Sequence, residues 1–409
     1  MRFVYHEFVA SRKQTKGRGI SRIIKPIEDI LWLIFLPAVL LSISAGQAVA
    51  VLLFALRLTR RERFHPLPGF LRPTLAFLGW AVLTALVADP GRWTDMLSKW
   101  WVILVAALVY DRARSTGGFP RMLLAVFITA VALFPFEIWG FFGTSAGRAM
   151  AFSGGAPSLG SNLMMLSIIC FALAGMARGR TKLAAGAFFI ILLAGLVMSV
   201  NRAALLGAAV ALGWMAFRRL PALVPAALLV LGTFMAVAPE SSITWRLRGI
   251  VRPYTSPTSE ERLHMWTSGM KMVRDQPMTG FATRRGFMEN YGTRYRHPRA
   301  LEAGPGHVHN SFIQTAVLHG VPGLGLLLWL LAIVWRNLRR ASRAAAADPW
   351  RAAAAASTLP LLLAVLVNSF FDFVPAEGQR ALMFWALVGL LPGFLFSKIP
   401  VTKKLRSPF

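Results

Sequence analysis

Long apolar stretches separated by short polar segments recur along most of this 409-residue chain. An α-helix needs about 20 predominantly apolar residues to cross the hydrocarbon core of a bilayer. The pattern predicts an all-α, polytopic membrane helix bundle with about twelve transmembrane helices, forming a single domain over residues 1–409. The predicted spans, placed to within a few residues, are Ile27 to Ser44, Gly46 to Leu58, Phe70 to Ala88, Trp93 to Tyr110, Pro120 to Gly143, Pro157 to Ala177, Leu183 to Ser199, Arg202 to Phe217, Leu220 to Ala238, Asn310 to Trp335, Ala352 to Phe373 and Gln379 to Phe396.

The composition agrees with a membrane protein. Hydrophobic residues make up 56% of the chain and charged residues only 15%, which is too apolar for a soluble protein of this length. A formal net charge of +28 would suggest a nucleic-acid partner in a soluble chain, but in a membrane protein Lys and Arg collect in cytoplasmic loops. We therefore predict no nucleic-acid partner. The single cysteine, Cys170, lies inside an apolar run and excludes both a disulfide framework and a Cys-based metal site.

The distribution of positive charge predicts the orientation of the chain. The basic N-terminal segment leads into the first span with no small-residue cleavage site after it, so we expect a retained signal anchor with a cytoplasmic N-terminus. In that frame, alternate loops carry the basic residues and both termini are cytoplasmic. The predicted cytoplasmic basic residues include Arg57, Arg60, Arg61, Arg63, Arg112, Arg114, Arg178, Arg180, Lys182, Arg218, Arg219, Arg336, Arg339, Arg340, Arg343, Lys403, Lys404 and Arg406.

One long external segment, residues 239–309, remains in this frame. It is rich in arginine, which suggests anionic ligands such as phosphates, although general attraction to lipid headgroups is an alternative explanation. Thr258 to Glu261 reads as a capping box, and apolar residues follow at helical spacing until Pro277. We therefore expect a partly helical periplasmic loop containing an amphipathic helix, with Arg262 in the first turn of that helix.

Candidate chemistry is concentrated between Gly304 and Gly323. A Gly/Pro-rich loop places His307, His309 and Asn310 at the start of an apolar helix, where titratable groups meet both water and hydrocarbon. Histidines that merely pack against neighbouring helices are the alternative. The sequence offers no third ligand at a recognisable spacing, so we predict no metal site.

Three further positions can support chemistry near the same membrane boundary. Arg202 joins two spans with hardly any loop and suits a diphosphate, although a snorkelling topological anchor is the alternative. Asp372 ends the eleventh predicted span, where it could orient a histidine or pair with an arginine. Arg285 is a further cation of the basic loop. For Glu137 and Lys99 we expect no role beyond pairing with an unidentified group.

The combination of separated motifs resembles the O-antigen ligase and polymerase superfamily, a group of bacterial lipid-carrier-dependent membrane glycosyltransferases. The resemblance rests on His309-Asn310-Ser311-Phe312, on Gly320-Val321-Pro322-Gly323-Leu324-Gly325, on Arg262-x-x-x-Trp266, on Pro277-Met278-Thr279-Gly280-Phe281 and on Asn201-Arg202-Ala203-Ala204-Leu205. It spans roughly Gly160 to Asp372. The chain departs from the family at Asn201, where Ser is usual, and at His319, where the family often has Glu.

The resemblance implies a metal-independent, inverting transferase that takes a glycan from an undecaprenyl diphosphate carrier at the periplasmic face of the bacterial inner membrane. Residue by residue, His309 would match the catalytic histidine, and Arg202 and Arg262 would match the arginines that bind the diphosphate. Asp372 matches only loosely. Asn310, Asn201 and Arg285 are possible supporting residues, and no cofactor is expected.

Two activities within the family and one outside it fit the sequence. The leading hypothesis is a ligase that transfers the glycan to lipid A core. The alternative is a polymerase whose acceptor is another carrier-linked glycan. A membrane transporter would favour inverted repeats and charged residues near the midplane, and the single large loop argues against it.

Overall fold

The computed structural model describes residues 24–59, 64–88, 90–116, 118–143, 149, 155–218, 257–302, 304–344 and 348–397. Within these ranges the chain is helical and contains no strand, so the predicted all-α membrane bundle is confirmed. Residues 24–41 form the first helix. The others are α2 (Ile43–Leu58), α3 (Leu71–Ala88), α4 (Trp93–Trp100), α5 (Leu104–Thr116), α6 (Phe119–Phe142), α7 (Gly155–Met176), α8 (Gly179–Met198), α9 (Arg202–Phe217), α12 (Pro257–Asp275), α13 (Arg284–Asn290), α14 (Ser311–Ser342), α15 (Pro349–Ser369) and α16 (Gly378–Leu395), with short 3₁₀ turns at Pro90–Arg92 and Trp101–Ile103 and a π turn at Tyr291–Tyr295.

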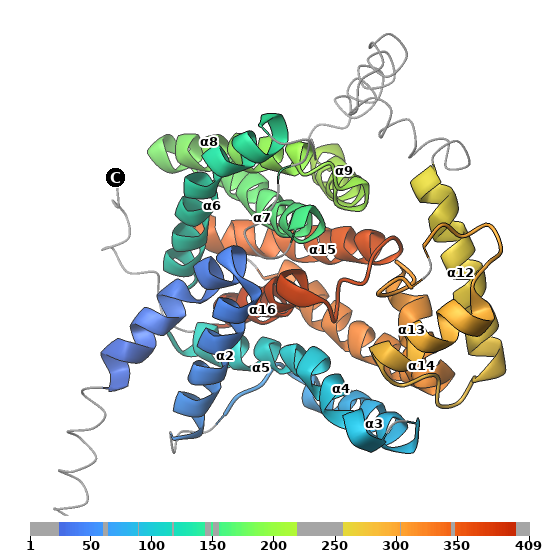
Figure 1. The fold of residues 1–409 in the computed structure, drawn as a ribbon. Coiled ribbons are helices and arrows are strands. Elements are labelled where there is room, and N and C mark those ends of the chain that lie inside the picture. The colour runs from blue at the N-terminus through green and yellow to red at the C-terminus, as the bar shows by residue number, and fades with distance from the viewer. Residues whose placement is uncertain are drawn as a thin grey trace, which may run out of the picture.

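Helix α16 is the core of the bundle. All of its residues from Gln379 to Leu395 are buried, and it contacts α5, α7, α14 and α15 (Figure 1). Two of its glycines, Gly389 and Gly393, let α5 approach closely, because a side chain at either position would collide with the α5 backbone near Ala106 and Tyr110. A helix that is apolar on every side belongs inside a bundle rather than at its surface.

The lengths of the helices agree with membrane insertion. Among the described residues, seven helices are long and apolar enough to cross a bilayer, namely α3, α6, α7, α8, α14, α15 and α16, and α2 and α9 are shorter apolar helices. The chain is therefore a multi-pass membrane protein.

Three helices differ from the predicted elements in their bounds or their continuity. The predicted span Trp93 to Tyr110 is divided into α4, a 3₁₀ turn and α5, because α4 carries the polar residues Asp95, Ser98 and Lys99 beside its buried Met96 and Trp100. The helix predicted to begin at Asn310 continues to Ser342 and is interrupted at Gly320. Helix α12 starts at Pro257, one residue before the Thr258 proposed as its cap. The predicted span Leu220 to Ala238, the first part of the external loop (239–256) and the basic N-terminal segment before residue 24 lie outside the described residues.

Hydrogen bonds between helix ends define two opposite ends of the bundle. At one, called here the loop end, the Asn201 Nδ2 donates to the Pro157 carbonyl (3.0 Å), and the Arg202 Nη1 donates to the Ser259 Oγ (3.2 Å). At the other, called here the basic end, Arg57 pairs with Asp111 (2.8 Å). Helices α12 and α13 lie beside α14 at one side of the bundle (Figure 1).

Candidate active site

The loop that precedes α14 is fastened to the loop that follows α15. The Asn310 side chain caps α14 by accepting from the backbone N–H groups of Phe312 (2.9 Å) and Ile313 (3.0 Å). Its Nδ2 donates to the carbonyl of Phe370 (3.1 Å). Ser311 Oγ donates to the carbonyl of Asp372 (2.7 Å). Two consecutive residues thus connect segments about sixty positions apart, which brings Asp372 to the histidines.

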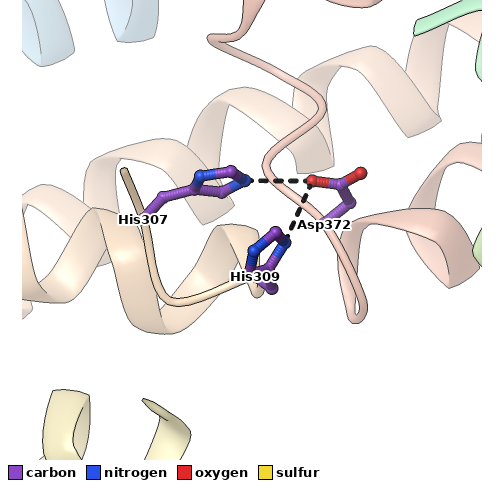
Figure 2. Close-up of side chains that lie close together, drawn as sticks. All are labelled: His307, His309 and Asp372. Carbon is purple, nitrogen blue, oxygen red and sulfur yellow. Dashed lines mark hydrogen bonds and ion pairs between the residues drawn. The ribbon is translucent and has the colours of Figure 1, made fainter. Parts of the chain in front are cut away.

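Two imidazoles meet one carboxylate at this junction. The His307 Nε2 lies 3.1 Å from the Asp372 Oδ1, and the His309 Nδ1 lies 3.8 Å from the same oxygen (Figure 2). The first distance is a hydrogen bond, whereas the second is too long for one. His307 also lies 3.3 Å from Glu377 Oε2. His307 is therefore fixed between two carboxylates, while His309 faces Asp372 with 30% of its side chain exposed.

Buried charge stabilises the carboxylates of the cluster. Arg380, itself buried, contacts Asp372 Oδ2 and donates to Glu377 Oε2 (2.9 Å). Burial by itself would raise the pKa of Asp372, but Arg380 and the two histidines outweigh it and hold that pKa well below its usual range. The pKa of Glu377 is lowered because His307 and Arg380 outweigh burial there too. Both groups are carboxylates at neutral pH.

His309 has the environment of a neutral base. Burial lowers its pKa, and the positive charge of Arg262 acts in the same direction, against the opposing effect of Asp372. A proton on Nδ1, facing the carboxylate, leaves the lone pair of Nε2 for a substrate. The backbone of His309 has φ +53°, in the left-handed region that non-glycine residues rarely occupy. Its carbonyl accepts from the Trp266 Nε1 (3.4 Å), so α12 helps to maintain this conformation.

The two predicted diphosphate arginines lie at the same side of α12. Arg202, the first residue of α9, donates to Ser259, and Arg262 lies one turn further along α12. Arg262 is half-buried, and burial lowers its pKa, while its guanidinium remains a cation. Among the described residues, Arg262 has no carboxylate within ion-pair distance. Its charge can therefore be offered to a ligand.

An apolar groove of about 800 Å³ begins beside these groups. Trp266, Asn310 and Phe370 line its end near the cluster, and Leu328, Leu331 and Trp335 continue it along α14. Because Arg262 and Trp266 are four residues apart on α12, they share one face of that helix. The groove therefore begins at Trp266 and Asn310, the neighbours of Arg262 on α12 and of His309 in the chain.

Asn201 and Arg285, two further predicted site residues, make contacts that stabilise helices. Asn201 caps α9 by accepting from Ala204 N–H (3.2 Å) and connects it to α7. Arg285 is exposed and pairs with Glu289 four residues later on α13. Its neighbour Arg284 extends instead toward the histidine loop, where a Cβ at Gly306 would collide with its guanidinium. Arg284 therefore lies beside the loop that carries His307 and His309.

His319 and the glycine that follows it form a separate structural joint. His319 is fully buried, with Nδ1 3.2 Å from Thr84 Oγ1 and its ring among Phe77 and Trp100. Gly320 (φ +69°, ψ −178°) interrupts α14 and exposes carbonyls and N–H groups to the segment 277–282. Phe281 N–H donates to Val317, Ala282 N–H donates to Leu318, and Val321 N–H donates to Pro277 (2.7–2.8 Å). The motif Pro277–Phe281 therefore packs against the motif Gly320–Gly325 at this break.

Several cluster residues were not found from the sequence. The sequence pattern assigns no function to Glu377, Lys99, Arg284 or Arg380, because these residues come from the start of α16, from α4 and from α13, and no spacing connects them to His309. Glu137, also without an assigned function, is buried within α6 against Gly195 of α8.

The cluster also has the arrangement of a metal site. The ligand atoms of His307, His309 and Asp372 all lie within 4.8 Å of one another, so Asp372 supplies the third ligand that sequence spacing did not reveal. Against a divalent cation, Arg380 occupies the second oxygen of Asp372, and the charge of Arg262 acts on His309. The donor set permits a metal, but the surrounding cations disfavour one.

The structure thus places a cluster of two histidines and a carboxylate near an apolar groove in a multi-pass helix bundle. Residues 187–328 match the family model described as O-Antigen ligase (Wzy_C). The match confirms the resemblance to the O-antigen ligase/polymerase superfamily, a family that implies lipid-linked glycan substrates in general. It includes Arg202, Arg262 and His309, whereas Lys99, Asp372 and Glu377 lie outside it. No curated protein matches the chain.

Proposed function

We propose that this protein transfers a glycan from undecaprenyl diphosphate to an acceptor hydroxyl, with His309 as the general base. The observation that carries the proposal is the position of His309, which faces Asp372 and lies next to Asn310 and Trp266, two residues that line the apolar groove. The groove suits a polyprenyl chain, since apolar side chains and lipid-like ligands associate without polar desolvation. The leading acceptor is lipid A core, which makes the protein a ligase.

The donor diphosphate is bound by Arg262 and Arg202. A planar guanidinium contacts two phosphate oxygens at once and remains charged at all relevant pH values. Arg202 is positioned by Ser259, one turn before Arg262, so the two guanidinium groups can bind neighbouring phosphates. In a partly dehydrated site these charges stabilise the leaving group as strongly as preorganised donors do in other enzymes.

Transfer is a single displacement. The acceptor oxygen forms a bond to the anomeric carbon, the bond from that carbon to the phosphate oxygen breaks, and its electron pair leaves with undecaprenyl diphosphate. The proton of the acceptor hydroxyl passes to Nε2 of His309, and Asp372 stabilises the imidazolium that forms. One displacement inverts the anomeric configuration. The carrier linkage supplies the energy, so no nucleotide is required.

The site belongs at the periplasmic face of a bacterial inner membrane in this proposal, with both chain termini in the cytoplasm. Arg57 and Arg112 at the basic end support this orientation, because Lys and Arg accumulate on the cytoplasmic side of membrane proteins. The part of the 239–309 loop that the structure describes contributes α12 and the histidines to the opposite end.

A deletion strain tests the proposal. Loss of the gene should leave lipid A core without ligated glycan, while carrier-linked polymer accumulates, as seen on a lipopolysaccharide gel. Wild-type plasmid should restore ligation, and the His309→Ala plasmid at equal membrane abundance should not. Single-repeat products instead would assign the polymerase reaction. Normal lipopolysaccharide in the deletion strain would contradict both activities.

A chelator separates the metal-independent mechanism from use of the histidine cluster as a metal site. Transfer by purified protein should survive EDTA, because the arginines supply the stabilising charge. Activity lost with EDTA and restored by one divalent ion would instead assign His307, His309 and Asp372 as ligands.

A further inference from the structure

A second, polar pocket lies beside the histidine cluster. It has a volume of about 440 Å³, and its lining includes Glu377, which also contacts His307 (3.3 Å). The His307 and His309 rings are 4.2 Å apart between centroids. Only one imidazole therefore separates the wall of this pocket from the proposed base.

Two cations face the pocket. Lys99 comes from α4 and Arg284 from the start of α13. Within the described parts of the chain, neither has a carboxylate within ion-pair distance. Glu377, the acid nearest to them in the lining, is occupied by Arg380 and His307. The lining therefore has positive charge that the protein does not neutralise by direct pairing.

The partial burial of Lys99 favours a ligand-binding role for this positive charge. The residue is only partly exposed, and burial lowers the pKa of its ammonium group, with Glu377 and Asp95 opposing and Arg284 adding to that effect. A half-buried ammonium without an ion pair is unfavourable unless a ligand supplies an anion. Other side chains in the pocket lining also suit an anionic ligand.

Amide and hydroxyl side chains complete the lining. Gln47 comes from α2, Ser158 from α7 and Gln379 from α16. Such groups exchange hydrogen bonds with sugar hydroxyls, and guanidinium and ammonium groups bind phosphate or carboxylate. The apolar groove, by contrast, is lined almost entirely by hydrophobic residues and suits the lipid part of the donor. The chemistry of the apolar groove therefore suits the donor lipid, and the chemistry of the polar pocket suits an acceptor sugar.

We propose that this pocket is the acceptor subsite and that Lys99 and Arg284 select an acceptor saccharide carrying an oxyanion, either a phosphate monoester or a uronic carboxylate. The proposal rests on the transferase function proposed above, since an acceptor presupposes transfer. Lys99 and Arg284 are binding residues that fix the sugar so that one of its hydroxyl groups reaches His309.

The test compares three matched oligosaccharides on the purified full-length protein in nanodiscs. One carries a phosphate monoester, one is the same compound after phosphatase treatment, and one has a uronic acid in place of the phosphorylated sugar. Binding is measured calorimetrically without donor, and acceptor KM is measured with donor present. The variants are Lys99→Met and Arg284→Gln, with Lys271→Met and Arg274→Gln as controls, because these exposed α12 cations make the same charge change outside the pocket.

Each pocket variant should weaken binding of the charged oligosaccharide about ten- to a hundredfold, as the loss of a charge-assisted hydrogen bond requires. Acceptor KM should rise by the same factor, with donor KM unchanged. The neutral oligosaccharide should bind weakly to wild type and be unaffected by the variants. The phosphorylated and uronic compounds distinguish which oxyanion the subsite prefers.

Two results have separate meanings. Charge-dependent binding that Lys99→Met abolishes, without any glycan transfer, supports an oxyanion-binding saccharide pocket but contradicts the transferase function and with it the acceptor role of the pocket. Efficient transfer to charged and neutral acceptors alike, with unchanged acceptor KM in both variants, overturns the subsite and leaves the transferase function intact. Arg284→Gln is an exposed substitution, so its result does not depend on whether the Lys99 variant folds.

Discussion

Two histidines ten residues apart occupy opposite kinds of environment in this protein. His309 has a partly exposed side chain, a left-handed backbone and a carboxylate facing its Nδ1. His319 is fully buried, contacts a threonine hydroxyl and packs among aromatic rings, directly before the break in α14 at Gly320. Both belong to the same Gly-rich stretch of sequence. Residue type and motif alone therefore do not distinguish a candidate base from a packing residue.

The two environments differ because different hydrogen bonds hold the chain around each histidine. Around His309, side-chain hydrogen bonds from Asn310 and Ser311 hold two loops together and leave polar groups facing cavities. Around His319, backbone hydrogen bonds connect the 277–282 segment to α14 on both sides of its break at Gly320. In the proposed function, the first region binds substrate and the second holds the scaffold. Disruption of each region should therefore give different measurements.

The largest effect is expected at His309. Its replacement by alanine removes a base and little packing, so kcat should fall by about 10²–10⁴-fold while donor affinity and the melting temperature change little. Purified variant at equal concentration, assayed with saturating donor, measures this.

His319→Ala is the comparison for that variant. It should lower the melting temperature, because it leaves a cavity among Phe77 and Trp100, yet keep transfer per folded molecule close to wild type. Equal losses of kcat in the two variants would contradict the division of functions between the histidines.

A smaller catalytic effect is expected at Arg262. Lysine keeps the charge but loses the bidentate fork, so Arg262→Lys should reduce kcat/KM for the donor about ten- to a hundredfold. Arg202→Lys should act in the same direction if it binds the second phosphate. Variants measured with varied donor and fixed acceptor give the values. If Lys supports full activity at both positions, the arginines are membrane anchors or solvated residues instead.

Gly320 tests the scaffold region without touching chemistry. Alanine there should destabilise the protein by about 1–3 kcal/mol from backbone strain alone, and more from its collision with the Met278 carbonyl. Gly325→Ala on the same helix is the matched control, since its Cβ meets nothing within 4 Å and alanine favours a helix. Thermal unfolding in detergent compares the two. An unchanged midpoint for Gly320→Ala would mean that the 277–282 segment is not docked as described.

The sequence predicted those parts of the site that local pattern determines. Apolar run lengths found most of the helices, helical spacing found α12, and the position of Asp372 at a span end indicated contact with a histidine or an arginine, both of which are present. The orientation of the cluster depends on Ser311 and Asn310 binding a loop about sixty residues away, which no local pattern encodes. Lys99 and Glu377 converge on one pocket from separate helices for the same reason.

The smallest predicted effect is a displacement of the pH profile. Because burial lowers the pKa of His309 below the ordinary histidine value of about 6.5, the imidazole remains neutral as the pH falls through 6.5. The acid side of the kcat/KM profile reports the pKa of His309 in the free enzyme. Its midpoint should therefore lie below pH 6.5, and activity should be lost only as the pH drops through the lowered pKa. Asp372 stays ionised over this range and adds no limb of its own. Trp266→Ala, which opens the α12 side of His309, should let water reach the ring and move the limb back toward 6.5. A limb above 6.5 in wild-type protein would indicate that the protonated histidine is favoured at this site, and would argue against His309 as the base.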